Sequence, residues 1–477
     1  MTTTLPTVEG SRVELTEESL TEFRARLRGE ALTSADPGYD QARRPFNAMQ
    51  TDHPSLIVRP SGTADVVEAV NYARENAIEL TVRGGGHSVA GLSSSDGGLV
   101  LDLSTMSGVV VDRAENVAHV QGGALWGDVD RETQLFGLAT PGGVVSDTGV
   151  AGLTLGGGYG WLRRKYGLAC DNLLAADVVG ADGQVRTASA DENPDLFWAL
   201  RGGGGNFGVV TSFTFSLHPV GPIVGFTGVF YPQAEAEQVL RGYREFFASA
   251  PDEVTAEAIS ITMPADPHLP EPIHDQQCFI VGAVYAGEAD EGMEVMRPLR
   301  ELGTPLADIS QPMPYTAVQS AFDPFFPRGV LQSYWKSLYL PELSDEAIEL
   351  IARKGAERPS PLTFVDTYVN GGAIREVAAD ESAFGDRSMP YMVAIAGSWN
   401  DPTDNDDNIA WIRDASREIG ALGGAGVYLN FTGLEEQDAK AGVADAFGAN
   451  LGRLAEIKAK YDPDNFFRRN NNVVPAG

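Results

Sequence analysis

The sequence predicts a two-domain protein of mixed helices and strands, in the α+β class, and three observations lead to that prediction. A chain of 477 residues is longer than one hydrophobic core usually supports, and a hydrophobic fraction of 43% fits a packed globular protein. The first half contains a β–α–β pattern and short strand-like runs separated by glycine-rich loops. Residues 221–427 instead have longer strand and helix patterns, more aromatic residues and fewer glycine clusters.

The β–α–β pattern lies near the start of the chain. Residues 1–50 predict a helical lead-in, with the helix at Glu17–Leu27. Ser55–Val58 predicts a strand, and Thr63 is expected to cap the next helix because threonine side chains accept hydrogen bonds from free backbone N–H groups. Alternating apolar residues over 78–83 predict a second strand, which leads directly into a glycine loop.

Hydrophobic periodicity and turn residues predict the remaining elements. In the first half, Ala181-Asp182-Gly183 predicts a hairpin turn, and strands are expected at Leu99–Leu103, Val109–Asp112, Val117–Gln121 and Val209–Leu217. In the second half, strands are expected at Gly225–Tyr231, Cys278–Tyr285, Tyr334–Leu340, Thr363–Asn370 and Met392–Trp399. Helices are expected there and beyond at Glu235–Ala248, Asp345–Lys354, Asn408–Ile419 and Asp438–Lys460.

The charge balance excludes some partners. With 35 basic and 66 acidic residues the net charge is −31, which repels nucleic acid and anionic membranes. Ordinary solubility and adaptation to high salt, where screening relieves the self-repulsion, both account for this charge. The chemistry of the protein does not follow from it.

The sequence gives little indication of a targeting segment, a disulfide or a metal site. The first twenty residues have neither a basic start nor an apolar core, so a cytoplasmic protein is expected. No apolar stretch is long enough to predict a membrane span. Cys170 and Cys278 could form one disulfide at most, and the histidines show no paired ligand spacing, so no metal site is expected.

The segment Arg83-Gly84-Gly85-Gly86-His87-Ser88 follows the second strand of the β–α–β pattern. Three glycines allow positive φ angles and can point several N–H groups at one anion, for which a pyrophosphate is a natural guest. The plainer interpretation is a tight turn with a surface histidine. The position of the loop favours the phosphate site, because a β–α–β unit commonly delivers phosphate ligands there.

A second glycine cluster contains G-x-G-x-x-G at Gly203, Gly205 and Gly208. A dinucleotide-binding fingerprint of this type must open a helix. The residues that follow, Val209–Phe215, are β-branched and aromatic and predict a strand, so the fingerprint is rejected. A Walker-type phosphate loop is also absent from the sequence.

Four runs in the same order resemble the berberine bridge enzyme relatives: Thr81–Gly91, Gly149–Asn172, Asp195–Thr211 and Tyr461–Asn472. These belong to the vanillyl-alcohol-oxidase and p-cresol-methylhydroxylase (PCMH) type of FAD enzymes, which includes 6-hydroxy-D-nicotine oxidase, glucooligosaccharide oxidase and aclacinomycin oxidase. The resemblance implies a two-part PCMH-type FAD-binding domain and a substrate domain built on an antiparallel sheet covered by helices. The expected boundaries are 1–50 for the lead-in, 51–220 for the FAD domain, 221–430 for the substrate domain and 431–477 for a C-terminal segment that returns to the FAD domain.

The resemblance implies FAD as cofactor, bonded through His87 to the flavin 8α-methyl carbon. The residues expected to bind the cofactor besides His87 are Arg83, Gly84, Gly85, Gly86, Ser88, Gly142, Gly143, Ser146, Thr148, Gly149, Gly152, Leu153, Gly158, Val209, Val210, Asn430, Asn470 and Asn472. Some relatives have a second tether, a cysteine whose position is occupied here by Val145. A single tether is therefore expected, with Cys170 as a buried free thiol.

On the substrate side, Gly426–Phe431 predicts a strand with Tyr428 and Asn430 on one face. The resemblance makes Tyr428 the group that takes a substrate proton, which requires neighbouring cations or donors to lower its pKa from about 10. A packed tyrosine with a satisfied hydroxyl is the plainer alternative. Tyr368 and Lys336 are further candidates for the catalytic site, and Arg387 is expected to be structural.

The resemblance therefore implies a flavin oxidase acting on a small organic substrate. A C–H bond next to oxygen or nitrogen would give its hydride to flavin N5, and O₂ would be the acceptor, giving H₂O₂. A dehydrogenase that excludes O₂ and a flavin-containing protein that binds or confers resistance to a natural product remain alternatives. The protein is expected to be a monomer or a homodimer.

Overall fold

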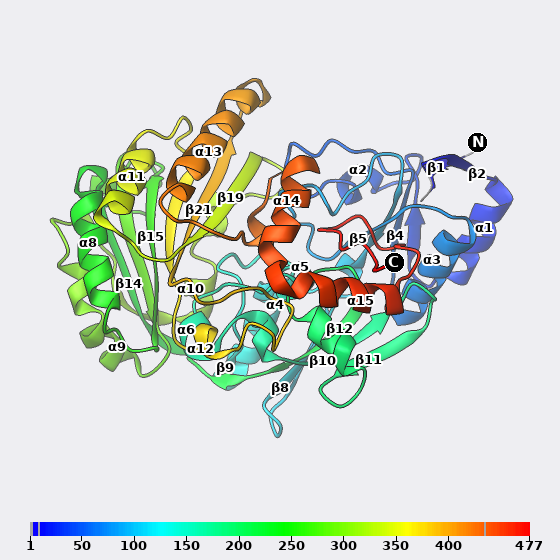
Figure 1. The fold of residues 1–477 in the computed structure, drawn as a ribbon, viewed down its shortest axis with the longest axis horizontal. Coiled ribbons are helices and arrows are strands. Elements are labelled where there is room, and N and C mark those ends of the chain that lie inside the picture. Colours follow the sequence, from blue (N-terminus) through cyan, green and yellow to red (C-terminus); the bar gives the residue numbers. More distant parts are fainter. Residues whose placement is uncertain (1–2, 8–9, 434–435) are drawn as a thin grey trace.

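Three β-sheets form the framework of the protein, seen in a computed structural model that describes residues 3–7, 10–433 and 436–477. Two of the sheets lie in the first half of the chain, and the third, with eight strands, lies in the second half (Figure 1). The chain therefore mixes helices with largely antiparallel sheets, which confirms the predicted α+β class. Among the described residues, no helix combines the length and apolar character needed to cross a bilayer.

A four-stranded sheet contains the predicted β–α–β unit. Its strand order is β3 (Glu30–Leu32), β4 (Leu56–Arg59), β6 (Leu99–Asp102) and β5 (Leu80–Arg83). Helix α3 (Thr63–Glu75) connects β4 to β5, and β6 lies between these two strands and pairs with both in parallel. The predicted cap at Thr63 is wrong. Gly62 occupies that position, while the carboxylate of Asp65 accepts the backbone N–H groups of Arg28, Gly29 and Ser61.

A five-stranded antiparallel sheet adjoins it. Its order is β11 (Val185–Ser189), β10 (Leu173–Val179), β12 (Val209–Ser216), β8 (Val117–Gln121) and β7 (Val109–Asp112). The hairpin predicted at residues 181–183 joins β10 to β11, with Gly183 at a φ of 75°. Strand β12 follows the second glycine cluster directly, which confirms that this cluster does not open a helix.

Short elements complete the first half of the chain. The lead-in contains the predicted helix, α1 (Glu17–Arg26), but also a small antiparallel sheet that the sequence did not predict. The remaining elements are β1 (Thr3–Pro6), β2 (Arg12–Leu15), α2 (Tyr39–Ala42), α4 (Trp126–Thr133), β9 (Leu138–Ala139), α5 (Val150–Leu155), α6 (Arg163–Tyr166), α7 (Pro194–Leu200) and β13 (His218–Pro219).

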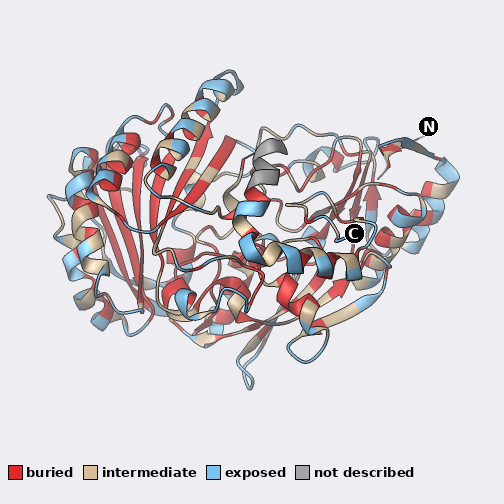
Figure 2. Ribbon diagram, in the orientation of Figure 1, coloured by how far each residue is buried: buried red, intermediate tan, exposed pale blue. Residues whose placement is uncertain are grey.

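The eight-stranded sheet is antiparallel throughout. Its order is β17 (Ala307–Asp308), β14 (Ile223–Pro232), β16 (Gln277–Tyr285), β15 (Val254–Thr262), β20 (Phe364–Val369), β21 (Tyr391–Trp399) and β19 (Gln332–Leu340), with β18 (Gln311–Pro314) paired to β14. The strands predicted for this half are present, and β15, β17 and β18 are additional. Figure 2 shows the long strands of this sheet almost entirely buried, whereas the short strands β17 and β18 are partly or fully exposed.

Helices cover one face of this sheet. Alternate strand residues on that face share a hydrophobic core with α8 (Ala236–Phe247), α11 (Asp345–Ala356) and α13 (Asn405–Gly420), as Figure 1 shows. These three helices match their predicted positions. Shorter helices in this half are α9 (Ala289–Val295), α10 (Tyr315–Gln319) and α12 (Ala373–Glu376). Strand residues of the opposite parity point to the other face, which we call the cavity face.

The C-terminal region returns to the first half of the molecule (Figure 1). The single helix predicted at Asp438–Lys460 is wrong, because two helices are present, α14 (Glu436–Phe447) and α15 (Leu451–Tyr461). A short 3₁₀ turn at Gly448–Asn450 separates them, and Gly448 has a φ of 46°, which an α-helix does not accommodate. Helix α15 packs on α7, and residues 462–477 then continue without regular structure.

Candidate active site

A cavity of about 300 Å³ lies between the glycine loops of the first half and the cavity face of the large sheet. Residues of the segments 84–88, 143–156 and 202–210 line it, together with residues of β15, β19, β20 and β21. Residues 428–432 and 469–471 border the same space. The cavity therefore brings together segments that are distant in the sequence, as an active site between domains commonly does.

The loop after β5 is built for close backbone contact. A Cβ atom on Gly85 would lie 2.4 Å from the Cα of Gly149, so that a side chain there would push the two loops apart. Gly86 has a φ of 70°, which disfavours other residues. On the cavity side, a Cβ on Gly152 or Gly205 would meet nothing within 4 Å, so their backbone faces open space.

His87 lies in the cavity wall with an unsatisfied nitrogen. Its ring stacks on Phe46 at 3.9 Å between centroids, and its Nε2 atom is buried without a hydrogen-bond partner. Burial, and secondarily the charge of Arg328, lowers the pKa of His87 to about 3. The imidazole is therefore neutral, and the Asp147 carboxylate 4.0 Å from Nε2 does not form an ion pair with it. A neutral, unpaired imidazole nitrogen is the form that can bond to carbon.

Most residues expected to bind the cofactor border this cavity. Besides His87 they are Gly84, Gly85, Gly86, Ser88, Gly143, Thr148, Gly149, Gly152, Leu153, Val210, Asn430 and Asn470. Ser93, Gly202, Gly204, Gly205, Arg469 and Asn471 also line it and were not predicted. The glycine fingerprint rejected from the sequence therefore contributes backbone to the cavity without opening a helix.

The other predicted cofactor residues do not line the cavity, for reasons visible in their contacts. The buried guanidinium of Arg83 donates to the carbonyls of Ala42 and Ser93, so it stabilises the loop without lining the cavity. Ser146 donates its hydroxyl and its N–H to Asp323. Val209 pairs with Val179 in the five-stranded sheet. Gly142, Gly158 and Asn472 also lie outside the lining.

The polar atoms of the cavity fit an FAD. Besides His87 Nε2, the hydroxyl of Ser93 and the Oδ1 atom of Asn470 are buried, belong to residues that line the cavity and have no hydrogen-bond partner among the residues that the structure describes. Unsatisfied buried polar atoms are uncommon and imply a ligand or water that completes them. Phosphates, ribityl hydroxyls and ring amides supply such partners, and Gly84–Gly86 would hold the pyrophosphate.

Neither Val145, at the position of the second tether of some relatives, nor Cys170 offers a reactive thiol to the cavity. Val145 lines the cavity where some relatives have a cysteine. Cys170 is buried and free, as predicted, and it lies outside the cavity lining. Burial, together with the neighbouring Asp171 carboxylate, raises the pKa of the Cys170 thiol, so it is unreactive. Arg387, expected to be structural, forms a buried two-pronged pair with Asp171 at 2.6 and 2.8 Å.

Tyr428 borders the cavity, but the strand predicted around it is wrong. The Phe431 N–H donates to the Tyr428 carbonyl at 2.9 Å, which closes a 3₁₀ turn over Leu429–Phe431. The Tyr428 hydroxyl accepts hydrogen bonds from the backbone N–H of Gly158 at 3.2 Å, the N–H of Tyr159 at 3.4 Å and the Asn430 amide at 2.8 Å. Burial nevertheless raises the pKa of this phenol, because it outweighs the three donors.

The two other catalytic candidates lie on opposite faces of the large sheet. Tyr368 projects from β20 into the cavity. Lys336 lies on the helix-covered face, with its ammonium 5.9 Å from the ring centre of Tyr334, and does not line the cavity. The alternation of side chains along β19 explains the difference, because the neighbouring Trp335 faces the cavity instead.

Two buried carboxylates in the cavity wall were not predicted. Glu257 in β15 lies opposite Tyr368 in β20, and Asp366 lies two residues before Tyr368 on the same face. Burial raises the pKa of Glu257 to about 7 despite the guanidinium of Arg163, 3.3 Å from its Oε1. Burial, and then the charge of Glu257, raises the pKa of Asp366. An acidic residue inside an otherwise apolar strand was the available signal in both cases.

Aromatic side chains make up much of the remaining wall. They are Tyr159, Phe322, Phe326, Trp335, Phe364, Tyr368 and Phe431. Several of these rings meet edge to face, for example Trp335 and Phe431 at 5.4 Å between centroids. Such a wall favours flat, apolar substrates.

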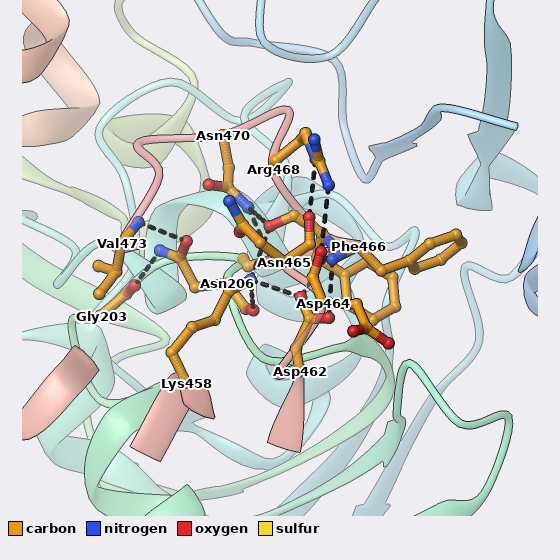
Figure 3. Close-up of polar contacts among 12 residues, drawn as sticks. Gly203, Asn206, Lys458, Asp462, Asp464, Asn465, Phe466, Arg468, Asn470 and Val473 are labelled. Atoms are coloured by element: carbon orange, nitrogen blue, oxygen red, sulfur yellow. Dashed lines mark hydrogen bonds and ion pairs between the residues drawn. The ribbon is translucent and has the colours of Figure 1, made fainter. Parts of the chain in front are cut away.

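A buried ion pair attaches the C-terminal loop to the second glycine cluster (Figure 3). Lys458 and Asp462 are both fully buried, and Lys458 also donates to the carbonyls of Asn206 at 2.6 Å and Phe467 at 2.9 Å. Asp462 accepts the N–H groups of Phe466 and Phe467. The amide nitrogen of Asn470 donates to the carbonyl of Gly205 at 3.1 Å. This bond keeps Asn470 at the cavity.

Comparison with known proteins agrees with this geometry. Residues 54–189 match the family model described as FAD binding domain, and residues 427–474 match the model described as berberine and berberine like. An FAD-linked oxidoreductase of Dictyostelium discoideum is 33% identical over 95% of this chain and 96% of its own length. The (R)-6-hydroxynicotine oxidase of Paenarthrobacter nicotinovorans is 31% identical over 94% of this chain and 98% of its own.

Solved structures show the same fold. The 6-hydroxy-D-nicotine oxidase of Arthrobacter nicotinovorans superimposes with a TM-score of 0.80 at 28% identity, covering 94% of this chain and 98% of that one. Glucooligosaccharide oxidase from Acremonium strictum, whose FAD carries both a cysteinyl and a histidyl bond, gives 0.83 at 25% identity over 96% and 100%. The chain therefore belongs to the berberine-bridge-enzyme-like FAD-linked oxidoreductases of the PCMH and vanillyl-alcohol-oxidase superfamily.

Proposed function

We propose that this FAD-linked oxidoreductase is an oxidase that carries its FAD on a single covalent bond through His87. The observation that carries the proposal is that the neutral, unpaired Nε2 of His87 and the hydroxyl of Tyr428 border the same cavity. When bound there, FAD would supply the acceptor for a hydride from a small organic substrate. Val145 and the buried Cys170 support a single tether, because neither offers a thiolate to the cavity.

The chain's own residues would orient the substrate and move its proton. Aromatic rings would hold an apolar body against the cavity face and exclude water. Tyr428 would accept the proton released from the substrate heteroatom as its phenolate, whose negative charge the N–H groups of Gly158 and Tyr159 and the Asn430 amide would stabilise before the transfer. Because burial raises the pKa of Tyr428, the phenol would first lose its own proton to solvent, and the rate of substrate oxidation would increase as the pH rises.

O₂ would accept the electrons and give H₂O₂. The relatives named as oxidases support this part of the proposal. To test for substrate oxidation, alcohols, sugars, amines and phenols are mixed with the enzyme under anaerobic conditions. A loss of flavin absorbance identifies the compounds that the enzyme oxidises. Mixing the reduced enzyme with air and measuring H₂O₂ tests the acceptor, and slow reoxidation without H₂O₂ would contradict the oxidase.

A further inference from the structure

The cavity face of the large sheet carries a charge imbalance that the oxidase reaction as proposed does not use. Glu257 and Asp366 are 1% and 6% exposed, and the guanidinium of Arg163, which is fully buried, is the cation beside them. Two carboxylates therefore share one guanidinium in a space that excludes most water. Buried charges are normally paired, so this cluster lacks one positive charge when both carboxylates are ionised.

The guanidinium of Arg163 forms hydrogen bonds with Glu257 and with backbone carbonyls. It donates to Glu257 Oε1 at 3.3 Å, to the carbonyl of Ala256 at 2.7 Å, to that of Gly160 at 3.1 Å and to that of Val369 at 3.3 Å. The carboxylate of Asp366 accepts a hydrogen bond from the Tyr368 hydroxyl, but its Oδ1 atom is buried and has no hydrogen-bond partner among the described residues. Asp366 lines the cavity, so this unsatisfied acceptor belongs to the space that a substrate would fill.

The surroundings of the carboxylates favour an organic cation. Tyr368 lies on β20 with Asp366 and opposite Glu257 of β15, and Trp335 and Phe364 line the same cavity. Aromatic faces next to carboxylates attract ammonium groups and also pack against an attached apolar body. A neutral alcohol would satisfy the Asp366 acceptor but would leave the charge imbalance in place.

We propose that Asp366, with Glu257 and Arg163 behind it, selects substrates that carry a protonated amine on an aromatic or otherwise apolar body. Asp366 would accept a hydrogen bond from the ammonium group, and the ammonium would supply the missing positive charge. In the absence of such a ligand the cluster keeps one proton, and binding of the ammonium form releases it. The inference rests on the proposed function and names the substrate class for the same site.

The test measures binding of matched probes to the holoenzyme by isothermal titration calorimetry under nitrogen. Benzylamine is compared with benzyl alcohol, its neutral counterpart of nearly equal size. The amine is expected to bind more tightly by roughly tenfold to a hundredfold, the usual gain from a hydrogen bond to a charged group. Titrations in two buffers of different ionisation enthalpy are expected to show about one proton released per amine bound and none for the alcohol.

The substitution Asp366→Asn removes the charge at nearly constant shape. Binding of benzylamine is expected to weaken by about tenfold or more, while binding of benzyl alcohol is unchanged. Asp130→Asn is the matched control, because Asp130 is also a buried carboxylate with a raised pKa but does not line the cavity. It is expected to leave both affinities unchanged. If D366N does not fold, proton release by the unaltered protein still decides the question.

Equal affinity of the unaltered protein for amine and alcohol would overturn the proposal, as would equal weakening of both ligands by D366N or failure of benzylamine to bind. Different results would contradict the proposed oxidase function. If an alcohol or sugar reduces the flavin and no amine binds, the oxidoreductase stands and the amine selectivity is lost. If benzylamine binds selectively but no compound of any class reduces the flavin, the selectivity stands and the oxidase is lost.

Discussion

Replacing Lys458 by methionine tests the importance of the buried ion pair in the C-terminal loop. The substitution keeps the apolar stem but removes three hydrogen bonds, to Asp462, Asn206 and Phe467, and leaves Asp462 as an unpaired buried charge. Breaking a buried pair by removing one partner commonly costs about 3–5 kcal/mol. Asp462 keeps two backbone N–H donors, so we expect the lower end, about 3 kcal/mol.

Urea unfolding followed by circular dichroism gives the loss of unfolding free energy, and flavin fluorescence in the same samples reports whether the cavity opens first. Lys460→Met is the control two residues away. The Lys460 side chain is 58% exposed and its ammonium pairs with Asp195 at 2.6 Å, so the loss of unfolding free energy should stay below about 1 kcal/mol. If K458M is no less stable than K460M, the ion pair does not stabilise the loop and the reasoning is wrong.

Three further predictions concern the cofactor, the proton acceptor and a buried acid. His87→Ala should leave no flavin on the denatured polypeptide, whereas Cys170→Ala should retain it; yellow H87A chains after denaturation would refute the tether. Tyr428→Phe should lower kcat/KM by about 10²–10⁴-fold with little change in substrate affinity, so an unchanged rate would exclude Tyr428 as the proton acceptor. Burial raises the pKa of Asp130 from 3.8 to about 7. The folded protein therefore retains a proton that the unfolded chain releases, and the stability associated with this carboxyl falls as the pH rises from about 4 to about 7. Asp130→Asn, which still offers an oxygen to Gln319, should stabilise the protein by up to about 4 kcal/mol near pH 8 and by almost nothing near pH 4 in urea titrations; equal effects at both pH values would contradict the assignment.

Local patterns in the sequence predicted the parts of the fold that depend on local physics. Strands β14, β16, β19, β20 and β21 and helices α8, α11 and α13 follow from periodicity, and each lies within a few residues of its predicted range. The errors arose where side chains or single residues override the pattern. Asn430 bends back onto Tyr428 and replaces the predicted strand by a turn, and Gly448 divides the predicted C-terminal helix.

Cavity residues that lie in recognisable sequence motifs could be predicted, whereas those that only the register of the large sheet brings together could not. Gly84–Ser88 lines the cavity because one loop carries all of it. Glu257 and Asp366 are more than a hundred residues apart, and only the register of β15 against β20 makes them neighbours. Lys336 was placed incorrectly because motif resemblance does not give the parity of a strand, and one residue decides which face a side chain occupies.

The attachment of the C-terminal loop has a consequence for how the protein is made. Asn470 and Asn471 border the cavity next to glycines 204 and 205, which precede them by more than 260 residues. During synthesis the ribosome must therefore release both segments before the cavity has its full set of walls. The flavin would be captured only after residues 470–471 have left the ribosome, so conditions that slow elongation between glycine 205 and these residues should delay the appearance of yellow protein without changing its final amount.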